Sequence, residues 1–175
     1  ILCKPISDTD IILDLGREQV GFLSFVLTSP CMQNITISYG EHLTDGRVRR
    51  IIGDRDFSIE YRAKVGNNVF FNPFRRFGCR YLEITSEYPL DIQKISIVPT
   101  MYVLTEKKRP KLTAAQNKIY DMCVETLHLC MHEHYEDCPW REQALYAMDS
   151  RNQMLCGYYA FGEYRFPRSN LELIS

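Results

Sequence analysis

The chain has 175 residues, of which 45% are hydrophobic and 25% are charged, and its formal net charge is −1. This length suffices for one domain, or for one domain and part of a second, and the composition is that of an ordinary globular protein. The balanced charge argues against nucleic-acid partners, which usually select a basic surface. No apolar run reaches the ~18 residues of a membrane span, so no membrane association is expected.

The first residues, ILCKPISDTD, lack the basic start and the long apolar stretch of a signal peptide. The sequence therefore leaves periplasmic, secreted and cytoplasmic locations open. Seven cysteines are scattered along the chain without close pairs. An odd number in a chain of this size predicts mostly reduced thiols that pack as small hydrophobic side chains.

Residues 1–105 are expected to form a β-domain, because their segments are rich in β-branched and aromatic residues and are separated by Gly, Pro and Asn. Ile35, Ile37 and Tyr39 alternate with polar residues, which is the period of a half-buried strand. The predicted strands are DIILDLG (10–16), VGFLSFVLTS (20–29), QNITISYGE (33–41), DFSIEYRA (56–63), NVFFNPF (68–74), CRYLEITS (79–86) and IQKISIVPTMYVL (92–104). Short strands without helical insertions predict an antiparallel β-sandwich, jelly-roll-like in type.

A short charged segment, residues 106–112, follows as a predicted solvated linker. From Thr113 the hydrophobic period changes to threes and fours, which predicts an amphipathic helix over TAAQNKIYDMCVETLHLCMHEH (113–134). Thr113 and Gln116 have the spacing of a capping box. A second helix is expected from Pro139 to about Tyr164, because proline is favoured in a first helical turn. A third is expected to begin at Ser169, so residues 113–175 form the helical part of the chain.

The stretch HEHYEDCPWREQALYAMD (132–149) is dense in groups that can bind metals or move protons. His132 and His134 are two residues apart, which places them on nearly opposite sides of a helix. The segment also lacks the HExxH pattern, and the cysteines at 123, 130 and 138 have no short-range partner. We therefore expect neither a metal site nor a cofactor here.

The carboxylates of this stretch have two interpretations. On the predicted helix Glu142 and Asp149 are seven residues apart and share one face, with Tyr146 between them. This face is explained by solvent exposure, with Asp137 as a helix cap. It is also explained by a sugar site, since carboxylates accept hydrogen bonds from hydroxyls and nearby aromatic rings such as Trp140 stack on pyranose rings.

The segment EDCPWREQALYAMD resembles the signature of family 78 glycoside hydrolases, the α-L-rhamnosidases. That signature opens with Asp-Cys-Pro and continues with Arg, Glu and a downstream Asp. The positions that match it are Asp137, Cys138, Pro139, Arg141, Glu142 and Asp149. NPFRRFGCRYLEI (72–84) also resembles the strand pair before the catalytic domain of that family. The resemblance implies a β-sandwich followed by the first helices of an (α/α)6 barrel.

This resemblance further implies an inverting hydrolase of terminal α-L-rhamnosides, whose partner is a rhamnose-containing oligosaccharide or glycoside. It assigns Glu142 as general acid, with Asp137, Asp149 and Arg141 among the groups that bind substrate. Trp140 and Tyr146 are candidates for the aromatic walls. The general base would lie in a later part of a longer protein, so this chain alone is expected to be inactive. Relatives carry Trp and Gly where this chain has Tyr146 and Met148, which leaves the sugar preference open.

A second hypothesis is a non-catalytic carbohydrate-binding or structural β-sandwich with a helical tail, in which NNVFFNPFRRFGCRY (67–81) forms the binding surface. The helical part is also expected to expose apolar residues, which predicts self-association or a homo-oligomer. These residues are Leu145, Leu155, Tyr158 and Phe161.

Overall fold

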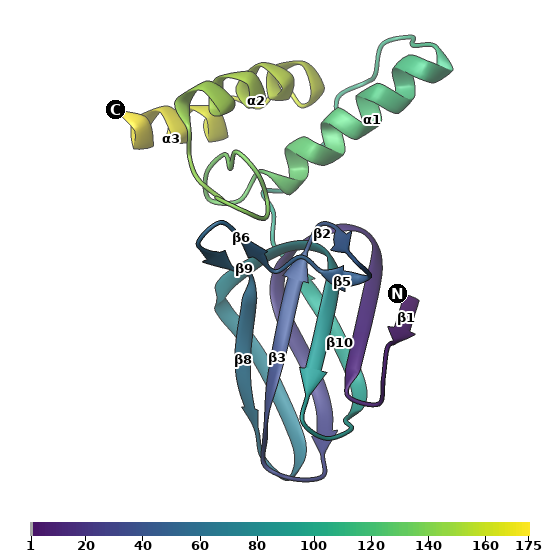
Figure 1. Ribbon diagram of the computed structural model, residues 1–175. Helices are drawn as coiled ribbons and strands as arrows, with labels where there is room; N and C mark the ends of the chain where they lie inside the picture. The colour runs from purple at the N-terminus through teal and green to yellow at the C-terminus, as the bar shows by residue number, and fades with distance from the viewer. Residues whose placement is uncertain (1) are drawn as a thin grey trace. The chain divides into compact units, whose positions relative to one another are not determined.

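The computed structural model describes residues 2–175. The chain divides into two compact units, Ile1–Thr100 and Met101–Ser175, which are described separately (Figure 1). No helix among the described residues is long and apolar enough to cross a membrane.

The first unit is built from antiparallel strands. Its longer strands are β1 (Leu2–Pro5), β2 (Asp10–Ser29), β3 (Gln33–Gly40), β8 (Ser58–Ala63), β9 (Gly66–Ser86) and β10 (Asp91–Pro99). Four two-residue strands form two small hairpins: β4 (Leu43–Thr44) with β5 (Arg47–Val48), and β6 (Ile51–Ile52) with β7 (Arg55–Asp56). The main sheet has the strand order β1-β2-β9-β3-β8. β10 pairs with the later part of β2, on the side opposite β9. The predicted antiparallel β-sandwich is confirmed, although the strands predicted at 10–16 and 20–29 are a single strand, as are those at 68–74 and 79–86.

The long strands β2 and β9 each contribute to both faces of the sandwich. The first part of β2, Asp10–Asp14, pairs with residues 81–85 of β9, and that part of β9 also pairs with β3. The second part of β2 pairs with β10 on one side and with residues 66–77 of β9 on the other. Register shifts in the β2–β9 ladder separate the two parts. Such irregularities bend a strand and increase its twist, which lets one ribbon cover two layers.

Aromatic side chains join the two layers. Phe25 of β2 lies edge-on to Tyr61 of β8 at 5.0 Å between ring centroids and stacks on Phe70 of β9 at 4.7 Å. Tyr39 of β3 stacks on Phe77 of β9 at 4.0 Å. Pairs of this geometry add to the area buried by the rings. The alternation predicted for 33–41 is confirmed, because Ile35, Ile37 and Tyr39 are buried; the list of buried sandwich residues also includes Ile12, Val20, Leu23, Leu27, Leu82 and Ile84.

The second unit contains α1 (Ala114–Leu129), α2 (Ala147–Ala160) and α3 (Arg165–Ile174). The predicted capping box is confirmed: the Gln116 amide donates to the Thr113 hydroxyl, and the Thr113 amide donates to the Gln116 side chain. The prediction that the first helix reaches His134 is wrong. The helix ends at Leu129, and an antiparallel bridge between Met131 and Tyr135 then closes a turn.

The start of α3 was also predicted wrongly. It begins at Arg165 and not at Ser169, because the Glu163 carboxylate accepts hydrogen bonds from the amides of Arg165 and Phe166, both at 2.9 Å. A carboxylate that accepts the first amide hydrogens of a helix fixes where the helix starts. Ser169 lies inside α3, where its hydroxyl donates to the Arg165 carbonyl.

A small core fills the space among the three helices. Its buried residues are Leu127, Met131, Tyr135, Met154, Ala160, Phe161 and Phe166. The prediction that the helical part exposes apolar side chains is therefore wrong for Phe161, which is buried. It is confirmed for Leu155, which is 42% exposed. The expectation for the cysteines is half right, because all seven thiols are free but only Cys79 and Cys130 are buried.

Candidate active site

The loop before α2 is closed by a reciprocal pair of hydrogen bonds. The Asp137 amide donates to the Ala144 carbonyl, and the Ala144 amide donates to the Asp137 carboxylate, both at 2.9 Å. The Gln143 side chain donates to the Pro139 carbonyl at 2.7 Å. Gln143 itself has a φ of 52°, in the left-handed region that helices exclude. These features keep residues 139–146 out of a helix.

The predicted helix from Pro139 to Tyr164 is therefore wrong in its first two turns. Glu142 lies in the loop, and α2 begins at Ala147 after Tyr146 as its N-cap residue. Asp149 is exposed in the first turn of α2. The shared helical face that the spacing predicted for Glu142, Tyr146 and Asp149 does not exist.

The loop nevertheless gathers part of the predicted site. One side-chain ligand atom each from Asp137, Cys138 and Glu142 lie within 4.8 Å of one another. The Cys138 thiol donates to Glu142 Oε2 at 3.1 Å, and the Glu142 amide donates to Cys138 Sγ at 3.3 Å. Burial raises the pKa of the Cys138 thiol. Cys138 therefore acts as a neutral anchor that fixes the position of the Glu142 carboxylate.

Arg141 forms an ion pair with the same carboxylate. Its Nε atom lies 2.8 Å from Oε2 and 2.7 Å from Oε1 of Glu142. The hydrogen bond to Glu142 raises the pKa of the Arg141 guanidinium, and the same contact favours the ionised form of the carboxylate. The Arg141 side chain is 54% exposed and that of Glu142 is 18% exposed. The Arg141 end of this ion pair is open to water, which screens its charge and limits what the pair contributes to stability.

The remaining predicted residues lie outside this cluster. Trp140 is 6% exposed and so presents little of its ring to a ligand, whereas Tyr146 is 50% exposed. Among the described residues, no group of three close ligand-type side chains includes Asp149. The structure thus brings together Asp137, Arg141 and Glu142, and it leaves Asp149 and Tyr146 at the start of α2.

The cluster offers three atoms of the kinds that bind metals. A metal binds the thiolate form of cysteine, and the raised pKa of Cys138 disfavours that form. One of the two carboxylates is already held by Arg141. The donor set therefore fits hydrogen bonding to a neutral ligand better than it fits a metal ion.

Two supporting residues were not singled out by the sequence. Glu136 is 2% exposed, its carboxylate lies 3.7 Å from His132 Nδ1, and its carbonyl accepts a hydrogen bond from Gln153 of α2. Asn170 of α3 is fully buried and accepts the Tyr135 amide hydrogen at 2.7 Å. Both contacts tie the base of the loop to the helices. No local pattern distinguishes the buried Glu136 from the exposed Glu133, since only packing separates them.

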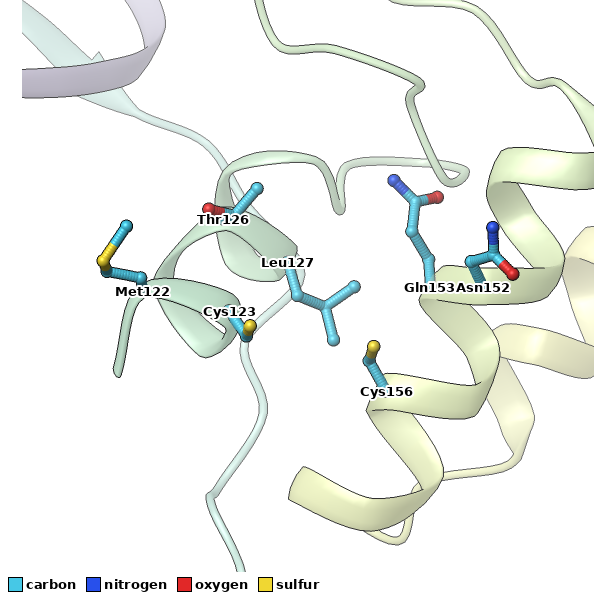
Figure 2. Close-up of a pocket in the computed structure, with 7 residues that line it drawn as sticks. All are labelled: Met122, Cys123, Thr126, Leu127, Asn152, Gln153 and Cys156. Carbon is cyan, nitrogen blue, oxygen red and sulfur yellow. The ribbon is translucent and has the colours of Figure 1, made fainter. Parts of the chain in front are cut away.

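A groove between α1 and α2 has a volume of about 330 Å³ (Figure 2). Leu127 points from α1 toward α2, and the list of lining residues continues with Met122, Cys123, Thr126, Asn152, Gln153 and Cys156. None of the predicted site residues lines it. The groove and the acidic cluster are therefore separate features of the helical unit.

Comparison with protein families identifies the first unit. The family model described as "Bacterial alpha-L-rhamnosidase concanavalin-like domain" matches residues 4–99, more than half of the chain. The sandwich is thus a concanavalin-like domain of a kind found in glycoside hydrolases. The chain belongs to the bacterial α-L-rhamnosidase family. No curated protein matches the chain.

Solved structures extend the similarity across both units. A family 78 rhamnosidase of Bacillus sp. GL1 superposes with a TM-score of 0.83 at 29% identity and covers 97% of this chain. A Klebsiella oxytoca rhamnosidase with rhamnose bound gives 0.73 at 22% identity over 94% of the chain. A Streptomyces avermitilis α-L-rhamnosidase complexed with L-rhamnose gives 0.57 at 17% over 79%. This chain spans 18%, 35% and 14% of those proteins, respectively. The likeness to the last two concerns the fold alone.

Proposed function

We propose that this chain supplies the proton-donating side of an α-L-rhamnosidase active site, with Glu142 as the general acid. The observation that carries the proposal is the setting of Glu142. Its side chain is 18% exposed, and its carboxylate accepts a hydrogen bond from the Cys138 thiol. A carboxyl group of this kind, partly withdrawn from water but reachable, suits protonation of a leaving glycosidic oxygen. The substrate class is a terminal α-L-rhamnoside, which the family match and the likeness to the Bacillus rhamnosidase support.

For the inverting reaction that we propose, the distance between the two loop carboxylates argues against Asp137 as the general base. Inverting glycosidases hold their acid and base about 6.5–9.5 Å apart, which leaves room for the attacking water. Atoms of Asp137 and Glu142 lie within 4.8 Å. We therefore assign Asp137 to substrate binding and place the general base in another part of a longer protein. The 18% share of the Bacillus rhamnosidase that this chain spans supports that placement.

The neighbours of Glu142 act on its proton in opposite directions. The Asp137 carboxylate disfavours a second negative charge, whereas the Arg141 guanidinium favours it. Glu142 donates a proton only in its neutral form, so the reaction requires Arg141 to release it. The exposed Arg141 side chain is then available to bind a rhamnose hydroxyl, and Glu142 Oε2 keeps its position through the Cys138 thiol.

The residues at the start of α2 complete the proposed sugar site. Asp149 is exposed and can accept hydrogen bonds from two adjacent hydroxyls. Tyr146, half exposed, presents a ring face for the apolar side of the pyranose. Trp140 is 6% exposed, so it offers a sugar little of its ring.

The test uses the longer protein that contains this chain, assayed on two aryl α-L-rhamnosides whose leaving groups differ in acidity. Glu142→Gln should lower kcat by about a hundredfold or more on the poor leaving group, the usual scale of general acid catalysis. The loss should be much smaller on an activated dinitrophenyl leaving group, which departs without protonation. Glu133→Gln, a change at an exposed carboxylate in the preceding turn, is the matched control and should keep full activity.

An equal loss on both substrates would remove Glu142 from the role of acid and leave it as a binding residue. Asp149→Asn should show this second pattern, because a residue that binds hydroxyls serves both substrates alike. If the unaltered protein releases neither aglycone, the proposed rhamnosidase activity itself is wrong.

A further inference from the structure

A polar cavity lies on the outer face of the sandwich, in the first unit, whereas the residues of the proposed active site belong to the second unit. Thr36 and Ser38 of β3 face away from the core, because Ile35, Ile37 and Tyr39 alternate with them and are buried. In the register of β3 with β9, Thr36 lies opposite Thr85 and Ser38 lies opposite Glu83. Four polar side chains thus form a square on adjacent strands.

The hairpin β4–β5 covers one side of this square. The Val48 amide donates to Glu83 Oε2 and the Arg47 Nε atom donates to Glu83 Oε1, both at 2.7 Å. Glu83 is 6% exposed, so its charge is compensated by the hairpin and not by water. The resulting cavity has a volume of about 370 Å³ and is also lined by Arg50. This is the size range of small-ligand sites, roughly 300–1,000 Å³.

The hydroxyl groups of the cavity are held ready for a ligand. Thr36 Oγ1 donates to Glu60 and Thr85 Oγ1 donates to Asp10, both at 2.8 Å. Each hydroxyl hydrogen is therefore used within the chain, and the two lone pairs of each hydroxyl oxygen can accept a hydrogen bond from a ligand. Because the carboxylates of Glu60 and Asp10 accept the two hydroxyl hydrogens, both hydroxyl oxygens are acceptors of defined direction toward a ligand.

Ser38 adds a hydroxyl that a ligand can reach. It is 5% exposed and lines the cavity, and its hydroxyl makes no hydrogen bond to any part of the chain that the structure describes. Its oxygen is open to the cavity and can both donate and accept a hydrogen bond there. A group in the cavity that both donates and accepts would satisfy Ser38.

Both guanidinium groups that line the cavity are already paired with carboxylates. Arg47 contacts Glu83 and Asp10, and Arg50 lies 3.8 Å from Asp56 and donates to Ser58. An anionic ligand would need a positive charge that is not already compensated. The lining therefore matches a neutral group rich in hydroxyls, each able to donate to Thr36 or Thr85 and to accept from Arg50.

We propose that this cavity binds one residue of a neutral saccharide, as a second carbohydrate site independent of Glu142. It differs in place from the surface that the sequence suggested at 67–81. In that segment Phe74 is 95% exposed and Phe71 is 53% exposed, while Phe77 is buried in the core. The cavity is instead formed by hydroxyls and guanidinium groups on β3, β9 and the covering hairpin.

The experiment titrates the isotope-labelled 175-residue chain with methyl α-L-rhamnoside, methyl β-D-galactoside or D-galacturonate and follows backbone amide resonances. A neutral glycoside should shift the resonances of Thr36, Ser38 and Thr85. Ser38→Ala and Arg50→Met should each weaken binding by at least about threefold, the scale of one hydrogen bond. Arg50 is partly exposed, so its replacement tests the site even if Ser38→Ala disturbs the fold.

Arg49→Met, at an exposed arginine that does not line the cavity, is the matched control and should bind the glycoside as the unaltered chain does. Three results would overturn the proposal: no shifts with either neutral glycoside, shifts confined to residues 137–149, or binding of galacturonate alone. Because the readout is binding in the first unit, failure of the rhamnosidase assay leaves this result unaffected.

Discussion

The Asp137 carboxylate and the Ala144 amide hold together the two ends of the loop that carries Glu142. The reverse hydrogen bond, from the Asp137 amide to the Ala144 carbonyl, makes the contact reciprocal. Asp137 therefore shapes the loop through one carboxylate oxygen. This structural role can be tested separately from the substrate binding that we propose for Asp137, by the choice of substitution.

Asp137→Ala should lower the free energy of unfolding by about 1–2 kcal/mol, because the Ala144 amide loses its acceptor. Asp137→Asn should cost less, since the amide side chain retains an acceptor oxygen in the same place. Denaturant unfolding followed by circular dichroism measures both. Glu133→Ala, at an exposed position in the preceding turn, is the control and should change stability little. Equal losses for Ala and Asn would show that the charge, and not the acceptor, matters.

Cys138 should react with iodoacetamide more slowly than Cys123 and Cys156 at pH 8. The last two are exposed, whereas burial raises the pKa of the Cys138 thiol and so reduces its thiolate fraction. Cys79, fully buried and with a pKa raised by burial, should be the slowest. Mass spectrometry of peptides over a labelling time course gives the order. In urea the differences should vanish, and equal rates in the folded chain would contradict the anchored thiol.

Glu18 should make the chain less stable as pH rises. Burial, with a smaller effect of Glu41, raises its pKa from 4.5 to about 8. In the unfolded chain Glu18 ionises near pH 4.5, while the folded chain keeps its proton until about pH 8. The folded state therefore loses stability across this window, by an amount on the order of 5 kcal/mol.

Glu18→Gln removes the titrating group, so the variant should gain stability at pH 8.5 and match the unaltered chain near pH 4. Unfolding by urea at both pH values measures the change. If the free energy of unfolding of the variant depends on pH as that of the unaltered chain does, the dependence comes from groups other than Glu18. Asp8→Asn, at an exposed carboxylate, is the matched control.

Gly21 should tolerate no side chain. A Cβ atom there would lie 1.9 Å from the Val98 carbonyl oxygen of β10, and the φ of Gly21 is 151°. Gly21→Ala must push β10 away from β2 and should cost about 3 kcal/mol or more. Gly53→Ala is the matched control, because Gly53 has a φ of 61° but open space around it. Its cost should stay near the ~1 kcal/mol of backbone strain. Similar melting temperatures for the two variants would contradict the clash.

The features that follow from local chemistry were predictable from the sequence. The alternation of Ile35, Ile37 and Tyr39 predicted a half-buried strand, and Thr113 with Gln116 predicted the start of α1. Both signals depend on residues within one element. The segment from Pro139 to Tyr146 was predicted as helix but forms a loop. The hydrogen bond between Asp137 and Ala144, seven residues apart, and the left-handed backbone of Gln143 hold this loop, and a local pattern reveals neither.

The candidate site was likewise predictable only in part from the sequence. The resemblance of residues 136–149 to a rhamnosidase signature predicted the roles of these residues, which stay predictions, and the loop places Glu142 beside Asp137 and Arg141. The helical spacing that first linked Glu142 with Asp149 was wrong, since the two belong to a loop and to α2. The cavity around Ser38 was not predicted at all. It depends on the register of β3 with β9 and on the hairpin that covers Glu83, neither of which a local pattern reveals.

The passage of β2 and β9 through both layers has a consequence for how the sandwich opens. In a sandwich of separate sheets, one sheet can detach while the other keeps its hydrogen bonds. Here the ladder between β2 and β9 extends from Asp10 to Ser29, so neither layer can separate without breaking pairs that also hold its partner. Amide hydrogens along the whole ladder should then exchange with solvent in one cooperative event, at the free energy of global unfolding.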